Sequence, residues 1–259
     1  MERVREEMVD LAGVGRVPLT VTERGAGRPF LLLHGGGGPL TVGSFADLLA
    51  NSANARVLTP THPGFGGTPR PDRLNSVRAL AALYVAFVEQ SGLSDVTVIG
   101  NSIGGWIAAE MGLLGSRRIT RIVLVDAVGI NVPGHPVIHF FSLPISDSAH
   151  YSYHQPDRFR IDPATMPPAQ REAMAGNREA LAVYAGTSSM TDSSLTRRLA
   201  GSTLPTLVVW GESDRIVDPD YGRAYAAAIP GARFVLLGET GHLPQLETPD
   251  KLLSVIARP

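Results

Sequence analysis

The stretch Val96-Thr-Val-Ile-Gly100-Asn-Ser102-Ile-Gly104-Gly105 decides the fold. A short apolar run ends at a serine between two glycines, and a second apolar run with helical spacing follows directly. This context is typical of a sharp strand–turn–helix junction that raises a serine hydroxyl above the end of a sheet. The glycines carry no Cβ, so the strand and the helix can approach closely. The alternative is a serine that only caps the helix, and the context favours a nucleophilic Ser102.

The chain on either side of this turn alternates between short apolar runs and segments with helical periodicity. Continuously apolar strands that alternate with helices are typical of a parallel sheet covered on both faces. We therefore predict an α/β fold with a mostly parallel central sheet flanked by helices. The strands are expected at residues 16–22, 29–33, 56–58, 96–99, 121–125, 207–210 and 234–237, and the helices at 45–50, 76–90, 103–114, 219–229 and 249–257.

The alternation of strands and helices stops near Gly129 and returns after about Ser202. The intervening residues are rich in Pro, His, Ser and Met, and their helical patterns are broken at 169–175, 178–185 and 195–200. A sheet interrupted once by such a segment indicates a core with an inserted helical cap. The predicted domains are a core of residues 1–128 and 203–259 and a cap of residues 129–202.

Composition excludes several classes of function. The 259 residues carry a net charge of -1, whereas a nucleic-acid-binding protein normally has a basic surplus. The chain has no cysteine, which excludes disulfides, zinc ribbons and thiol nucleophiles. Its longest apolar run, residues 79–88, is about half a membrane span, and the charged N-terminus does not resemble a signal peptide. We expect a cytoplasmic protein with a small-molecule substrate and neither nucleic-acid nor membrane partners; the oligomeric state is not predicted.

A serine hydroxyl needs a base at neutral pH, and the chain has seven histidines. His242 follows the last predicted strand, and site residues collect in loops at the carboxyl ends of parallel strands. His34, His62 and the four histidines of the insertion are the alternatives, and His34, which comes directly after a buried run, is interpreted as a packing residue. The sequence therefore predicts that His242 is the base.

The acid that orients the base is expected between the serine and the histidine in the chain. Asp214 lies just past a predicted strand and is the preferred candidate. Asp218 precedes Pro219, an arrangement that favours a helix N-cap. Asp126 ends an earlier strand and is the remaining alternative.

A tetrahedral intermediate also needs backbone N–H groups directed at its oxyanion. Ile103, the residue after the serine, supplies one. The glycine-rich loop 35–38 after the strand at 29–33 supplies the other, which we assign to Gly36, with Gly37 as the alternative.

Five motifs in this order resemble the α/β-hydrolase superfamily over residues 29–259. The resemblance implies an α/β-hydrolase fold, a Ser102–Asp214–His242 triad, an oxyanion hole at Gly36 and Ile103, and no cofactor. The serine at the turn distinguishes the chain from the haloalkane dehalogenases and the related epoxide hydrolases, which resemble it but use aspartate there. The motifs are His34-Gly-Gly-Gly, Thr61-His-Pro-Gly-Phe-Gly-Gly-Thr68, Gly100-Asn-Ser-Ile-Gly-Gly105, Gly211-Glu-Ser-Asp214 and Gly241-His-Leu-Pro-Gln-Leu-Glu247.

The turn and the glycine-rich loop are also similar to hydrolases that cut carbon–carbon bonds in ring-cleavage products, and Gln245 and Glu247 fit that pattern. Leu243 departs from it, because those enzymes usually carry tryptophan after the histidine. They also need a cap arginine for the substrate carboxylate. The candidates in this chain are Arg158, Arg160, Arg171 and Arg178.

These observations predict a carboxylesterase-like serine hydrolase that cleaves a small carboxylic ester, thioester or lactone through an acyl-enzyme. The alternatives are a carbon–carbon bond hydrolase for ring-cleavage dienoates and a weakly catalytic small-molecule receptor on the same fold. The histidine pairs 135/139 and 150/154 have a spacing that could suit a metal, but no complete ligand set accompanies them. No metal site is therefore predicted.

Overall fold

The computed structural model describes residues 2–52, 54–160, 162, 164–187 and 189–257. Within them the centre is an eight-stranded sheet of order β1-β2-β4-β3-β5-β6-β7-β8. β2 is antiparallel to β1 and β4, and every other neighbouring pair is parallel, which confirms the predicted α/β class. The strands are β1 (Glu2–Leu11), β2 (Gly15–Gly25), β3 (Arg28–Leu33), β4 (Ala55–Pro60), β5 (Val96–Asn101), β6 (Ile119–Val125), β7 (Thr206–Gly211) and β8 (Arg233–Leu237).

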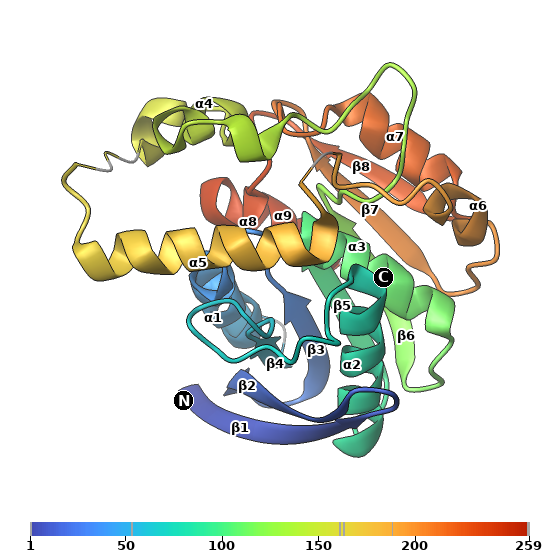
Figure 1. The fold of residues 1–259 in the computed structure, drawn as a ribbon. Coiled ribbons are helices and arrows are strands. Elements are labelled where there is room, and N and C mark those ends of the chain that lie inside the picture. The colour runs from blue at the N-terminus through green and yellow to red at the C-terminus, as the bar shows by residue number, and fades with distance from the viewer. Residues whose placement is uncertain (1, 53, 161, 163, 188, 258–259) are drawn as a thin grey trace.

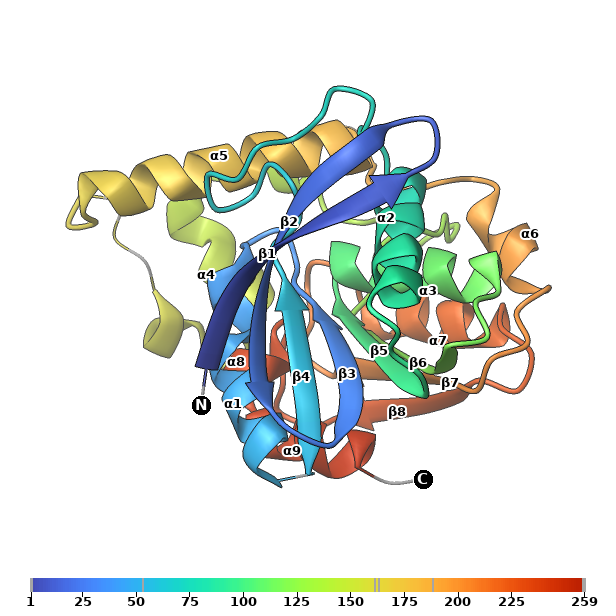
Figure 2. The same cartoon turned by 90° about the horizontal axis from the view of Figure 1, so that it is seen from below.

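Helices cover both faces of the sheet (Figures 1 and 2). No helix in the described part of the chain has both the length and the apolarity to cross a membrane. The α-helices are α1 (Gly43–Ser52), α2 (Val77–Gln90), α3 (Ile103–Leu114), α4 (Ser148–Ser152), α5 (Pro168–Ala185), α6 (Leu195–Leu199), α7 (Pro219–Ala227), α8 (Pro244–Glu247) and α9 (Pro249–Ile256). The 3-10 helices are η1 (Pro39–Val42), η2 (Phe140–Ser142), η3 (Ile145–Asp147) and η4 (Pro156–Phe159).

The alternation of side chains along each parallel strand divides the core into two layers. In β3, Leu31 and Leu33 belong to the buried cluster that includes residues of α2, α3 and α7, while Phe30 and Leu32 belong to a second cluster with residues of α1 and α9. This burial on both sides explains why the parallel strands read as continuous apolar runs. It also fixes the carboxyl ends of β3, β5, β6, β7 and β8 along one edge of the sheet, where the predicted site residues follow.

The N-terminal strand β1 was not predicted from the sequence. It forms a ten-residue antiparallel ladder with β2 at the edge of the sheet. Most of its side chains are exposed or half-buried, and only Val9 and Leu11 are buried. Because so little of β1 is covered, most of its positions carry charged side chains. The strand therefore lacks the alternation of apolar and polar residues by which strands are recognised in a sequence.

The connection between β6 and β7 contains η2, η3, α4, η4, α5 and α6. The predicted cap, residues 129–202, falls within it. In Figure 1, α5 runs from the left side to the middle of the molecule, above β3 and β4 in this view. α5 is one continuous helix, although the sequence pattern divides it near Asn177. A polar residue interrupts the apolar stripe there because the Asn177 amide binds the core: it donates to Gly37 O (3.1 Å) and accepts from Gly66 N (2.8 Å).

An ion pair fastens α6 to the core. The Arg198 guanidinium forms two hydrogen bonds of 2.6 Å with the Glu110 carboxylate of α3, whose side chain is 4% exposed. Arg198 also contacts Asp192 at 2.7 Å. Removing one partner of a buried pair leaves the other charge unpaired in the interior, which is the most destabilising way to disrupt it.

We therefore expect Arg198→Ala to lower the free energy of unfolding by about 3 kcal/mol, measured by urea denaturation. The neighbouring Arg197 is exposed, so Arg197→Ala is the matched control and should change stability little. Equal effects of the two substitutions would contradict the role given to the ion pair.

Candidate active site

Ser102 lies on a strained turn between β5 and α3. Its backbone has a φ of 57° and a ψ of −119°, a combination that side-chain-bearing residues rarely adopt. The flanking glycines are sterically required: a Cβ on Gly100 would lie 2.0 Å from Gly104 O, and one on Gly104 would lie 2.4 Å from Leu33 O. Ser102 is half-buried, while its neighbours Asn101 and Ile103 are buried. The turn therefore lifts one hydroxyl out of the core.

The predicted base and acid are in direct contact. His242 Nδ1 donates to Asp214 Oδ2 at 2.7 Å, and the two side chains are 7% and 0% exposed. Asp214 Oδ1 accepts from the backbone N–H groups of Ile216 (2.8 Å) and Val217 (3.1 Å). With its hydrogen on Nδ1, the imidazole has the Nε2 lone pair available to accept a proton.

Of the three members of the predicted triad, the structure joins two by a hydrogen bond, His242 and Asp214. Within the described residues, no hydrogen bond joins Ser102 Oγ to His242. Catalytic hydrogen bonds are often long in enzymes without substrate, so this contact is not needed for the assignment. The roles of Ser102, Asp214 and His242 stay predictions.

The two alternative acids have different surroundings. Asp218 caps α7: its Oδ1 accepts from Asp220 N (3.0 Å) and Tyr221 N (2.9 Å), as the sequence pattern predicted. Asp126 is fully buried and lies beside the pair, because it, Asp214 and His242 each place a ligand atom within 4.8 Å of the others. Burial, followed by the charge of Asp214, raises the pKa of the Asp126 carboxyl well above its ordinary value.

The glycine-rich loop after β3 reaches the serine. A Cβ on Gly35 would lie 3.2 Å from Ser102 Cβ, and Gly38 N bonds Gly35 O at 3.1 Å to close a turn over Gly36 and Gly37. Ile103 is the first residue of α3, so its N–H has no acceptor within the helix. Both elements of the predicted oxyanion hole thus lie next to Ser102, while the choice of Gly36 or Gly37 stays a prediction.

A buried aromatic cluster holds the start of this loop. The rings of His34 and His62 lie 3.7 Å apart, and both side chains are fully buried, which confirms that His34 is a packing residue. His34 Nε2 accepts from His62 N (3.1 Å), and His62 Nε2 donates to His34 O (2.9 Å). Burial lowers the pKa of His34 to about 4 and that of His62 well below its ordinary value, so both rings are neutral at pH 7.

Sequence reasoning missed the residues that tie the His242 loop to its surroundings. Ser152 O, in α4, accepts from His242 N at 2.8 Å. The Glu247 carboxylate accepts from Gly241 N (2.7 Å), His154 N (3.1 Å) and Gln155 N (2.9 Å). Glu247 was noted only as part of a family pattern, and no periodicity shows that a carboxylate will bind three backbone N–H groups.

Below the histidine, two buried amides link its loop to the serine strand. Asn101 Nδ2 donates to His242 O at 3.0 Å, and Gln245 Nε2 donates to Asn101 Oδ1 at 3.1 Å. Asn101 directly precedes Ser102 in the chain. These bonds therefore fix the loop of the predicted base against the strand that carries the predicted nucleophile.

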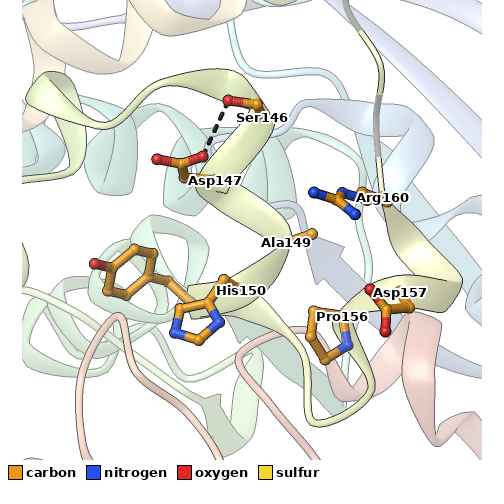
Figure 3. A pocket seen from close by; sticks show the side chains of 8 residues that line it. Ser146, Asp147, Ala149, His150, Pro156, Asp157 and Arg160 are labelled. Carbon is orange, nitrogen blue, oxygen red and sulfur yellow. Dashed lines mark hydrogen bonds between the residues drawn. The ribbon is translucent and has the colours of Figure 1, made fainter.

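The arginines of the predicted cap differ in what they contact. The Arg178 guanidinium donates to Phe140 O at 2.9 Å and lies over the rings of Phe140 and Phe141, so it holds the insertion together. Arg160 lines an open pocket of about 330 Å³ whose walls come from the segment between Ser146 and Arg160. Figure 3 shows its guanidinium directed toward Ala149. No member of the predicted triad lines this pocket.

One histidine of each pair considered for metal binding has another partner. His135 Nδ1 bonds Asp218 Oδ2 at 2.8 Å, and His154 Nδ1 bonds Ser213 Oγ at 2.7 Å. Among the residues that the structure describes, the one group with metal-ligand geometry is Asp126, Asp214 and His242. Asp214 and His242 are already joined by a hydrogen bond, so the closeness of these three side chains is explained by shared protons and needs no metal ion.

Residues 30–255 match the sequence profile of the alpha/beta hydrolase family. Lipase 3 of Moraxella sp. (strain TA144) is 26% identical over 234 residues, covering 85% of this chain and 73% of the lipase. The 2-hydroxymuconate semialdehyde hydrolase of Pseudomonas putida is 26% identical over 249 residues, covering 90% and 87%. A thermophilic esterase from Thermogutta terrifontis superposes with a TM-score of 0.76 at 23% identity, covering 97% and 96%, which is a likeness of fold.

The buried histidines predict an acid-dependent loss of stability. Folding lowers the pKa of His34 from 6.5 to about 4, so the unfolded chain binds the proton more readily. The free energy of unfolding is therefore not reduced by protonation of His34 at pH values above 6.5, and it decreases as the pH drops from 6.5 toward 4. Urea denaturation at several pH values should show a shallower decline for His34→Gln than for the wild type, with the exposed His139→Gln as control. An unchanged decline in His34→Gln would contradict this assignment.

Proposed function

Because this chain belongs to the alpha/beta hydrolase family, we propose that it is a serine hydrolase that cleaves small carboxylic esters, thioesters or lactones through an acyl-enzyme. The observation that carries the proposal is the strained Ser102 turn, whose preceding residue Asn101 bonds the backbone of His242, together with the His242–Asp214 hydrogen bond. A positive φ at a side-chain-bearing residue costs about 1–3 kcal/mol, and such strain concentrates at functional sites. We also propose that residues 129–202 form a cap above the site and that the partner is a small-molecule substrate.

In the proposed mechanism, Ser102 Oγ attacks the ester carbonyl while His242 Nε2 removes its proton. Asp214 holds the imidazole through Nδ1–H and stabilises the imidazolium that forms. The oxyanion receives hydrogen bonds from the N–H groups of Ile103 and of Gly36 or Gly37. His242 then protonates the leaving alcohol, and water, activated by the same histidine, hydrolyses the acyl-enzyme to restore Ser102.

The second candidate is carbon–carbon bond hydrolysis of a ring-cleavage dienoate. It is favoured by the likeness over 90% of this chain to a 2-hydroxymuconate semialdehyde hydrolase. That reaction needs a cationic anchor for the substrate carboxylate and a carbanion leaving group stabilised by prior ketonisation. Leu243 replaces the usual tryptophan, and Arg178 is engaged with Phe140 and Phe141. These features favour ester hydrolysis over carbon–carbon bond hydrolysis.

The choice between the two reactions is tested with a panel of aryl esters of short to long acyl chain and a ring-cleavage dienoate. We expect the highest kcat/KM on short-chain aryl esters, because ester cleavage needs only an acyl pocket and the oxyanion hole. A dienoate that is preferred over every ester by about a hundredfold, nearly 3 kcal/mol in transition-state binding, would establish the second candidate instead.

The acid assignment predicts a contrast between two neighbouring aspartates. Asp214→Asn should lower kcat by about a thousandfold or more, because the histidine loses the partner that fixes its tautomer. Asp218→Asn is the matched control and should cost little, because asparagine also caps a helix. Steady-state kinetics on the best ester measures both, and retention of activity in Asp214→Asn would refute the assignment.

A further inference from the structure

Two buried carboxyl groups lie together at the ends of adjacent strands, and they do not share the available donors equally. Asp214 accepts hydrogen bonds from His242 Nδ1 and from two backbone N–H groups. Asp126 accepts one, from Gly211 N to its Oδ1 at 2.7 Å. Its Oδ2 is buried and, among the described residues, has no N–H or O–H donor. The donors of the site thus support a negative charge on Asp214 and not a second one on Asp126.

A second charge at this place would be unfavourable for two reasons. Asp126 has no exposure to solvent, so an ionised carboxylate would lose its hydration without gaining enough hydrogen bonds. Asp214 adds like-charge repulsion from a carboxylate oxygen within 4.8 Å. Burial, then this repulsion, raises the pKa of Asp126, and the hydrogen bond from Gly211 N, which lowers it, does not offset them. The described titratable groups facing Asp126 are Asp214 and His242.

We propose that Asp126 is a protonated positioning residue whose carboxylic acid donates its hydrogen from Oδ2 to the Asp214 carboxylate. The pair holds one proton and one negative charge. The hydrogen bond draws charge away from the Asp214 oxygens and so moderates how strongly they stabilise the His242 imidazolium. The effect on catalysis rests on the proposed function, whereas the protonation of Asp126 does not.

The backbone directs Asp126 toward this partner. The residue has a φ of 47°, and its N–H donates to Val209 O at 3.0 Å, which fixes the turn at the end of β6 against β7. Asparagine and glycine both tolerate a positive φ. Asparagine can also reproduce the proposed bonds, since Oδ1 can accept from Gly211 N while Nδ2 donates to Asp214. Both Asp126→Asn and Asp126→Gly should therefore keep the turn. Asp126→Asn keeps a hydrogen-bond donor to Asp214, whereas Asp126→Gly removes it.

Infrared difference spectroscopy tests the protonation directly. At pH 7 the wild type should show the carbonyl stretch of a protonated, buried carboxylic acid, and Asp126→Asn should lack it. Asp218→Asn is the control and should retain the band. A band unchanged in Asp126→Asn, or absent from the wild type, would overturn the proposal. A metal ion bound by this group would require an ionised Asp126 and would also be revealed by the missing band.

The pH dependence of ester hydrolysis tests the positioning role. Asp126→Asn should lower kcat less than about tenfold, compared with about 10⁴-fold for a histidine that has lost its ionised partner. Asp126→Gly should move the acid limb of the kcat/KM profile upward by a fraction of a pH unit, because Asp214 loses a donor and only part of the strength of a hydrogen bond to a charged group is transmitted to the imidazolium.

A large loss of kcat in Asp126→Asn, or an acid limb that does not move in Asp126→Gly, would overturn the positioning role. If the protein hydrolyses no ester at all, the proposed function fails, and the infrared band still decides the state of Asp126. The two failures are therefore distinguishable.

Discussion

The contact on which the site depends is steric: two backbone segments meet where a side chain would not fit. Gly100 and Gly104 let β5 and α3 approach each other and the end of β3, because a Cβ at either position would overlap a carbonyl oxygen. The close approach forces Ser102 into a positive φ and exposes its hydroxyl. It also brings the glycine-rich loop after β3 to the serine, so that one packing constraint arranges both the proposed nucleophile and its proposed oxyanion donors.

The rest of the site is built from loops at the same edge of the sheet, and polar contacts fix each of them. The His242 loop is held from below by Asn101 and from the insertion by Ser152, while Glu247 binds three backbone N–H groups around it. Because the insertion and the His242 loop share these bonds, a movement of α4 is coupled to the position of the proposed base. In the same way, Asn177 of α5 joins the insertion to the glycine-rich loop.

The sequence predicted what depends on local patterns and missed what depends on tertiary contacts. The parallel strands were recognisable because burial on both faces requires continuous apolar runs, and the Ser102 turn because its glycines are sterically required. β1 was missed because its exposed face needs no apolar alternation. The continuity of α5 was missed because Asn177 interrupts the apolar stripe in order to bond the glycine-rich loop, a contact that no local pattern reveals. The proximity of Asp126 to Asp214 follows from strand order: β6 and β7 are 80 residues apart in the chain and adjacent in the sheet.

The central claim is that Ser102 is the nucleophile, and covalent labelling tests it most directly. After reaction with a fluorophosphonate, intact-mass and peptide analysis should find a single adduct on Ser102, lost in a folded Ser102→Ala variant, because only a serine activated by a neighbouring base reacts with this reagent. An active protein that is labelled at another residue, with Ser102 unmodified, would contradict the account.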